Sequence, residues 1–194
     1  MSHLVWGDTC GYTWGKIDTR VHIPISNPKQ RQTYYGEINY RTGQIIMRAY
    51  TKGNSVNTIK FIETLRTIHP HQKLILIWDG ATYHDSQEFR NYLSEVNGDK
   101  PEHHWPLYYI KLAPYVPEQN PIKAMWLQAK NFLRKVWHLF KTFKTVKWLF
   151  QSFINHFILR SAQLNMYGIF SSIITVCSSS QNQLGLLWIE THEL

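Results

Sequence analysis

One acidic residue stands where an apolar segment of strand length ends. Residues 74–78 are four aliphatic residues and a tryptophan, and Asp79 follows them directly. A carboxylate at the end of a buried strand is costly unless it binds something, most often a metal ion or a proton that is to be moved. In the alternative, structural interpretation, Asp79 caps the next helix or closes a turn with Gly80. Taken alone, the residue leaves both interpretations open.

Two pairs of histidines, His69 with His71 and His103 with His104, suggest metal binding at first sight. Neither pair has further ligands nearby at a spacing that metal sites use, so we expect both pairs to lie in surface loops.

The second half of the chain is strongly basic. Between His103 and Arg160, Glu118 is the only acid, against nine basic residues: Lys111, Lys123, Lys130, Arg134, Lys135, Lys141, Lys144, Lys147 and Arg160. Trp137 and Trp148 are interleaved with them. This pattern suits a helical face that contacts DNA phosphates, without base identity, through Lys130, Arg134, Lys135, Lys141, Lys144 and Lys147. The alternative is a solvated helix face.

Composition limits the class of protein. The chain has 194 residues, of which 43% are hydrophobic and 14% aromatic, enough for a folded α/β domain with an appendage. The net charge of +8 indicates a polyanionic partner, nucleic acid before membrane. Cys10 and Cys177 lie far apart, which favours free thiols in a reducing compartment such as the cytoplasm. We see no signal peptide and no run of ~20 apolar residues that could span a membrane.

The expected elements begin almost at the first residue with the end of a strand, and a β-hairpin, a helix and the strand before Asp79 follow. A further helix, a strand and a proline-rich loop lead into two amphipathic helices and a serine-rich tail. Their approximate ranges are 4–6, 33–40, 44–50, 54–68, 74–78, 85–97, 105–112, 121–140 and 146–159. This order predicts an α/β fold: a ribonuclease-H-like mixed sheet flanked by helices, with a C-terminal helical extension. We place the domain at 1–140 and the extension with its irregular tail at 141–194.

Two short motifs, one after the strand at 74–78 and one before the helix at 121–140, resemble those of a known family. Residues 78–84 read Trp-Asp-Gly-Ala-x-x-His, and residues 112–122 read Leu-Ala-Pro-Tyr-x-Pro-Glu-Gln-Asn-Pro-Ile before a helix with Trp126. Together they resemble the catalytic half of a mariner-type DDE transposase, in its prokaryotic insertion-sequence branch, over about residues 3–160. The resemblance implies that three carboxylates hold two Mg²⁺ or Mn²⁺ ions for DNA cleavage and strand transfer. It makes Asp79 the second acid and a metal ligand. His84 either orients a phosphate or closes the turn.

The chain departs from the family at the third acid, which should follow Asn-Pro-Ile and is Lys123 here. An ammonium removes a ligand and repels the metals, by about 4 kcal/mol per unit of ion charge at ~4 Å and an effective dielectric of ~20. Glu118 matches another acid of the family's loop, which is expected to order that loop rather than bind metal.

The first acid also departs from the pattern. In the family it precedes a Trp by about a dozen residues, and counting back from Trp14 runs past Met1, so we expect a truncated start. Asp8 then matches a second, less critical acid. If the spacing between the first acid and Trp14 is shorter, Asp8 is the first catalytic acid and a metal ligand. In the structural alternative Asp8 is an ordinary turn residue.

The expectation is therefore a transposase catalytic domain acting on double-stranded DNA, with Mg²⁺ or Mn²⁺ bound weakly or not at all and with activity absent or severely reduced. Three alternatives stay open. They are a non-catalytic DNA-binding remnant that inhibits or accompanies an intact transposase, an active nuclease that uses Asp8, Asp79 and Glu118, and an expressed fragment without a role. We see no helix-turn-helix, so the chain would depend on a partner polypeptide that supplies one, or it has lost specific end recognition. A homodimer is a further alternative. The expected location is the cytoplasm, in association with the nucleoid.

Overall fold

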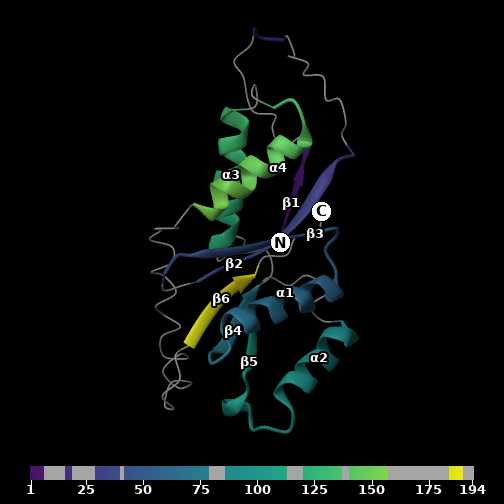
Figure 1. The fold of residues 1–194 in the computed structure, drawn as a ribbon, viewed down its shortest axis with the longest axis vertical. Coiled ribbons are helices and arrows are strands. Elements are labelled where there is room, and N and C mark those ends of the chain that lie inside the picture. Colours follow the sequence, from purple (N-terminus) through teal and green to yellow (C-terminus); the bar gives the residue numbers. More distant parts are fainter. Residues whose placement is uncertain are drawn as a thin grey trace.

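The computed structural model describes residues 1–6, 16–18, 29–39, 42–78, 86–112, 120–136, 140–156 and 184–189. Its elements run β1, β2, β3, α1, β4, α2, a short 3₁₀ helix, β5, α3, α4 and β6 along the chain (Figure 1).

An antiparallel ladder forms the first part of the sheet. It joins β1 (Ser2–Val5), β2 (Arg31–Ile38) and β3 (Ile45–Tyr50) in that spatial order. The hairpin between β2 and β3 closes at Gly43, whose φ of 68° suits a residue without a side chain. Asn39 holds the turn, because its N–H donates to the carbonyl of Gln44 at 2.8 Å. This confirms the predicted hairpin.

A parallel ladder forms the second part. Here β4 (Lys73–Trp78) lies between β5 (Leu107–Lys111) and β6 (Leu184–Ile189). The strands thus pair in two three-stranded sheets, one antiparallel and one parallel. In Figure 1, β6 runs alongside β4 and close to β2, so the two sheets adjoin there. The sequence analysis predicted no strand after Arg160, so β6 is new information.

Two helices cover the face of the sheet that carries Tyr35. They are α1 (Ser55–Ile68) and α2 (Gln87–Asn97), and their N-caps Asn54 and Ser86 each accept a backbone N–H two to three residues into the helix. The Tyr35 hydroxyl fixes the start of α1: it accepts from the Asn54 N–H at 3.0 Å and donates to the Asn54 carbonyl at 3.1 Å.

The other two described α-helices lie on the opposite face (Figure 1). They are α3 (Pro121–Lys135) and α4 (Phe143–Asn155). The prediction that the first of them runs to about residue 140 is wrong, because α3 ends at Lys135 and the Val136 N–H turns back to the Leu133 carbonyl. The apolar period continues through this turn, which is why the pattern overran it. Thr142 then caps α4, which starts earlier than predicted.

Period-two alternation in the strands builds a separate core on each face. Tyr34 and Ile38 of β2 join Ile75 and Ile77 of β4 under α3 and α4, while Tyr35 packs with α1. The buried residues of α4 share the first of these cores: Phe143, Val146, Phe150 and Ile154. The arrangement confirms the predicted fold class, a ribonuclease-H-like mixed sheet with helices on both faces. The boundary at residue 140 stays a prediction.

Candidate functional site

The described strands β4 and β5 end at the same edge of the sheet. The Leu112 N–H donates to the carbonyl oxygen of Trp78 at 2.8 Å, just beyond the last ladder pair. Ligands of α/β sheets bind outside the carboxyl ends of parallel strands, so this edge is the first place to look for a site. Asp79 follows Trp78 in the chain but lies outside the described residues, as do Asp8, His84 and Glu118.

The head of α3 is anchored on the face of the sheet that carries Ile77. Pro121 opens the helix, where its missing N–H costs nothing, and Ile122 is fully buried in the same cluster as Ile75 and Ile77. Lys123 is half-buried, and its backbone N–H donates to the Asn120 carbonyl at 3.0 Å. The position that the sequence analysis matched to the family's third acid is therefore on a helix that packs against β2 and β6 and shares a core cluster with Ile75 and Ile77 of β4.

Two buried polar side chains near these elements were not singled out from the sequence. Asn120 is 2% exposed, and neither atom of its side-chain amide has a hydrogen-bond partner among the described residues. Glu37 in β2 is 1% exposed, and in the described part of the chain nothing hydrogen-bonds to its two carboxylate oxygens. Burial raises the pKa of Glu37 well above its usual range. The signal in the sequence was an acid in a predicted strand, directly before Ile38 and after two tyrosines.

Glu37 does not supply a carboxylate at the position of Lys123. Its neighbour Gly36 lies against Trp126 and Ile122 of α3, and alternation turns the next side chain to the other face, the one covered by α1. Lys123 and Glu37 thus belong to opposite sides of the sheet.

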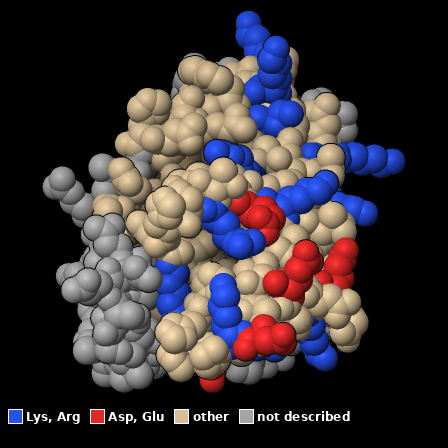
Figure 2. All heavy atoms as spheres, turned by 60° about the horizontal axis from the view of Figure 1, so that its bottom comes forward, with Lys and Arg blue, Asp and Glu red and all other residues tan. Residues whose placement is uncertain are grey.

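The helices α3 and α4 form the candidate nucleic-acid interface. Residues 120–136 and 140–156 contain no Asp or Glu and carry seven cations: Lys123, Lys130, Arg134, Lys135, Lys141, Lys144 and Lys147. Lys135, Lys141 and Lys144 are exposed, and the other four are half-buried. The contrast with the α1 and α2 side is clear. In Figure 2, which brings the α2 and β5 end forward, acidic and basic groups lie side by side.

The helix dipole stabilises the cations at the end of α3 and disfavours those at the start of α4. Arg134 and Lys135 are in the last turn of α3, where the negative end of the helix dipole stabilises a positive charge. Lys141 and Lys144 flank the start of α4, whose first turn has no acid. There the positive end of the dipole disfavours a cation by about 0.3–1 kcal/mol. Their placement does not serve helix stability, and it concentrates positive potential where an anion would be attracted.

Of the two histidine pairs, His71, His103 and His104 are exposed, whereas His69 is half-buried at the C-cap of α1. The rings of His103 and His104 are exposed and lie 4.1 Å apart between centroids. Burial lowers the pKa of His69. Within the part of the chain that the structure describes, no three His, Cys, Asp or Glu side chains come together as metal ligands. The described residues, with Lys123 at the head of α3, therefore do not make up a metal centre by themselves. No described helix is long and apolar enough to cross a membrane.

Comparison with known proteins gives one match. A family model described as DDE superfamily endonuclease matches residues 6–147, which include the strands β2 to β5, the helix α3 and the start of α4. Searches of curated proteins and of solved structures found no match. Because the family match spans well over half of the chain and joins the sheet edge to the head of α3, the protein belongs to the DDE superfamily endonucleases.

Proposed function

We propose that this chain acts on double-stranded DNA as a transposase catalytic domain of the mariner-type superfamily, prokaryotic insertion-sequence branch, and that its cleavage activity is absent or severely reduced. The observation that carries the proposal is Lys123, a cation at the head of a helix that shares a core cluster with β4, at the position where the family places a carboxylate. DDE chemistry needs hard oxygen ligands for divalent metals, and an ammonium supplies none.

The packing supports a shared site for Asp79 and residue 123. Ile77 and Ile122 belong to one core cluster, and each stands within two residues of one of these positions in the chain. In the proposed arrangement Asp79 would offer an oxygen ligand from the end of β4, with Asp8 as a second metal-binding candidate. The Lys123 ammonium would repel a divalent ion there, so Mg²⁺ or Mn²⁺ would bind weakly or not at all.

A nicking assay on supercoiled DNA with Mg²⁺ or Mn²⁺ tests this proposal. We expect background nicking from the natural chain and increased nicking from Lys123→Glu, because the substitution adds the missing carboxylate. Lys123→Gln is the matched control: it removes the charge without adding a ligand and should stay near background. Efficient nicking by the natural chain would contradict the loss of activity.

The same assay separates the atypical nuclease. If Asp8, Asp79 and Glu118 formed a working triad, the natural chain would nick DNA, Glu118→Ala would abolish nicking and Lys123→Glu would barely change it. Our proposal instead predicts background nicking by the natural chain and increased nicking by Lys123→Glu.

A non-catalytic DNA-binding protein is the second candidate function, and the acid-free helices α3 and α4 favour it. Such a remnant would occupy DNA ends or form mixed dimers with an intact transposase. It would bind DNA in a salt-sensitive way, with no metal-dependent nicking even by Lys123→Glu. We further propose that the chain forms a homodimer or binds a partner polypeptide that carries a helix-turn-helix. We place the protein in the cytoplasm with the nucleoid. Co-sedimentation with the nucleoid, and light scattering with and without DNA, test these two points.

A further inference from the structure

Trp148 is an exposed aromatic residue in the middle of a polar helix face. Its side chain is 63% exposed, although α4 contributes four buried residues to the core. Val146 and Phe150 are two residues away on either side and are fully buried. Since successive residues turn by about 100° around a helix, Trp148 points directly away from that core. It is therefore not the rim of the hydrophobic cluster.

The neighbours of Trp148 are cationic or polar. Lys144 lies one turn earlier on the same outward face and is exposed, and Asn155 lies two turns later and is also exposed. Lys147 is half-buried, with its Nζ 5.8 Å from the centroid of the Phe143 ring. The aromatic plane thus stands among positive charges on a helix that carries no acid.

The charged neighbours of Trp148 limit the class of partner that this surface can bind. A single exposed apolar side chain is ordinary on a protein surface, so exposure alone would carry nothing. The centre of a protein–protein interface is usually apolar and poor in charged residues, whereas Lys144 and Lys147 stand next to Trp148. A membrane-surface helix would need its apolar face free, and the apolar face of α4 is buried. A polyanion that also offers flat aromatic rings fits both features.

We propose that Trp148 stacks on an unpaired base of single-stranded DNA while Lys144 and Lys147 contact the phosphates on either side of that nucleotide. The inference rests on the proposed DNA contact by α3 and α4 and adds a preference for unpaired strands. In a duplex the base faces are covered by their neighbours, so the indole gains only phosphate-side contacts there. In a single strand every base offers a face, which makes the contact tolerant of sequence.

Fluorescence anisotropy with the full chain tests the inference, using a labelled oligothymidine of about 20 nucleotides and a duplex of the same length. Trp148→Leu keeps apolar bulk and removes the aromatic ring. It should weaken single-strand binding roughly tenfold and leave duplex binding within about twofold. Trp148→Phe should recover part of the loss. The slope of affinity against salt should not change, because the phosphate contacts remain.

Two controls make the result specific. Leu127→Ala removes another exposed apolar side chain, 55% exposed on α3, and should leave both affinities unchanged. Lys144→Gln should reduce the salt slope for both probes by roughly one contact. If Trp148→Leu melts at a lower temperature than the natural chain, Trp148→Gln is used in its place and carries the same expectation.

The outcomes distinguish this inference from the proposed function. Equal loss on both probes, or no loss on the single strand, overturns the stacking role and leaves DNA binding by the helices standing. If the natural chain binds neither probe at low salt, the proposed function fails as well. A loss confined to the single strand, with partial recovery by Trp148→Phe, supports the inference.

Discussion

The indole of Trp126 lies against Gly36, so that a side chain of α3 rests directly on the backbone of β2. A Cβ atom placed on Gly36 would come within 2.6 Å of Cζ2 and 2.7 Å of Cη2 of Trp126, and within 3.1 Å of Cδ1 of Ile122. Trp126 is 3% exposed and stacks on Phe150, so it has little room to move. This close approach sets the height of α3, and with it Lys123, above the sheet.

Gly36→Ala is therefore expected to destabilise the fold by about 1–3 kcal/mol, because overpacking forces a buried indole from its position. Urea unfolding followed by circular dichroism measures the change. Trp126→Phe, which shortens the ring system, costs stability alone but should relieve part of the Gly36→Ala penalty. A double-mutant cycle should show coupling of about 0.5–3 kcal/mol. Strict additivity would mean that the two residues do not compete for space.

Glu37 predicts an unusual dependence of stability on pH. Its pKa in the folded protein is raised by burial above the ordinary value of 4.5. The folded state therefore holds a proton that the unfolded state releases. The stabilisation is fully present below about pH 4.5 and is lost as pH rises through the folded pKa, by up to about 1.4 kcal/mol per pH unit.

Glu37→Gln removes that titration while it keeps the size of the side chain. Its stability relative to the natural chain should rise with pH from about 4.5 upward. Urea unfolding at a series of pH values from 4 to 8 measures the difference, and Glu95→Gln on the exposed side of α2 serves as a control that should not reproduce it. Parallel pH profiles for Glu37→Gln and the natural chain would show that Glu37 is ionised in the folded protein.

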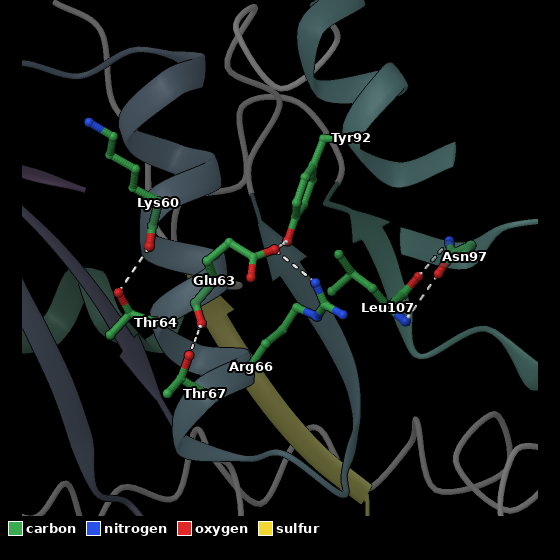
Figure 3. Close-up of polar contacts among 8 residues, drawn as sticks. All are labelled: Lys60, Glu63, Thr64, Arg66, Thr67, Tyr92, Asn97 and Leu107. Carbon is green, nitrogen blue, oxygen red and sulfur yellow. Dashed lines mark hydrogen bonds and ion pairs between the residues drawn. The ribbon is translucent and has the colours of Figure 1, made fainter. Parts of the chain in front are cut away.

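Asn97 joins the end of α2 to the start of β5 through both atoms of its amide (Figure 3). Its Oδ1 accepts from the Leu107 N–H at 3.3 Å, and its Nδ2 donates to the Leu107 carbonyl at 3.1 Å. The residue is 6% exposed. Asn97→Ala leaves these backbone groups without side-chain partners, at a cost of about 1–3 kcal/mol measured by thermal or urea unfolding.

Two comparisons make the Asn97 result interpretable. Asn97→Asp retains the acceptor and loses the donor toward the Leu107 carbonyl, so it should also destabilise the fold. Tyr92→Phe removes the hydrogen bond that Tyr92 donates to Glu63, a carboxylate on α1 that also pairs with Arg66 at 2.8 Å (Figure 3). Glu63 and Arg66 are partly exposed, so we expect Tyr92→Phe to lower the free energy of unfolding by less than about 1 kcal/mol. A larger loss from Tyr92→Phe than from Asn97→Ala would reverse our ranking of these contacts.

Local patterns predicted most of the described elements because each signal acts within a few residues. The predicted helix starts at residues 54, 85 and 121 lie within two residues of the observed ones, where Asn54 and Ser86 are the N-caps and Pro121 opens α3. The end of α3 was missed because apolar spacing continues through Val136, while the turn at Lys135 is set by how α4 packs back onto the core. The spacing of apolar residues along the helix does not show where the packing of α4 ends it.

Long-range features could not be derived in the same way. The position of β6 beside β4 depends on pairing between segments more than a hundred residues apart, which no local pattern contains. The strand itself, Leu184–Ile189, is an apolar run of strand length, a signal that the sequence analysis missed. At the candidate site, the motifs indicated that Asp79 and Lys123 belong together. Ile122 of α3 shares a core cluster with Ile77 of β4, which agrees with that expectation for Lys123, while Asp79 lies outside the described residues. The burial of Glu37 could not be anticipated without knowing that α1 covers that face of β2.

The cations of α3 and α4 predict how DNA affinity responds to salt. Each phosphate contact contributes about 0.9 to the slope of log affinity against log salt for a duplex. Lys135→Gln and Lys141→Gln should each lower that slope by roughly this amount and weaken binding about equally across duplex sequences, because phosphates carry no base identity. Lys60→Gln is the matched control. Lys60 is exposed on α1, on the other face of the sheet, so its loss should leave the slope unchanged if DNA lies along α3 and α4. Equal effects from Lys60→Gln and Lys135→Gln would indicate attraction to the net charge of the molecule rather than to these helices.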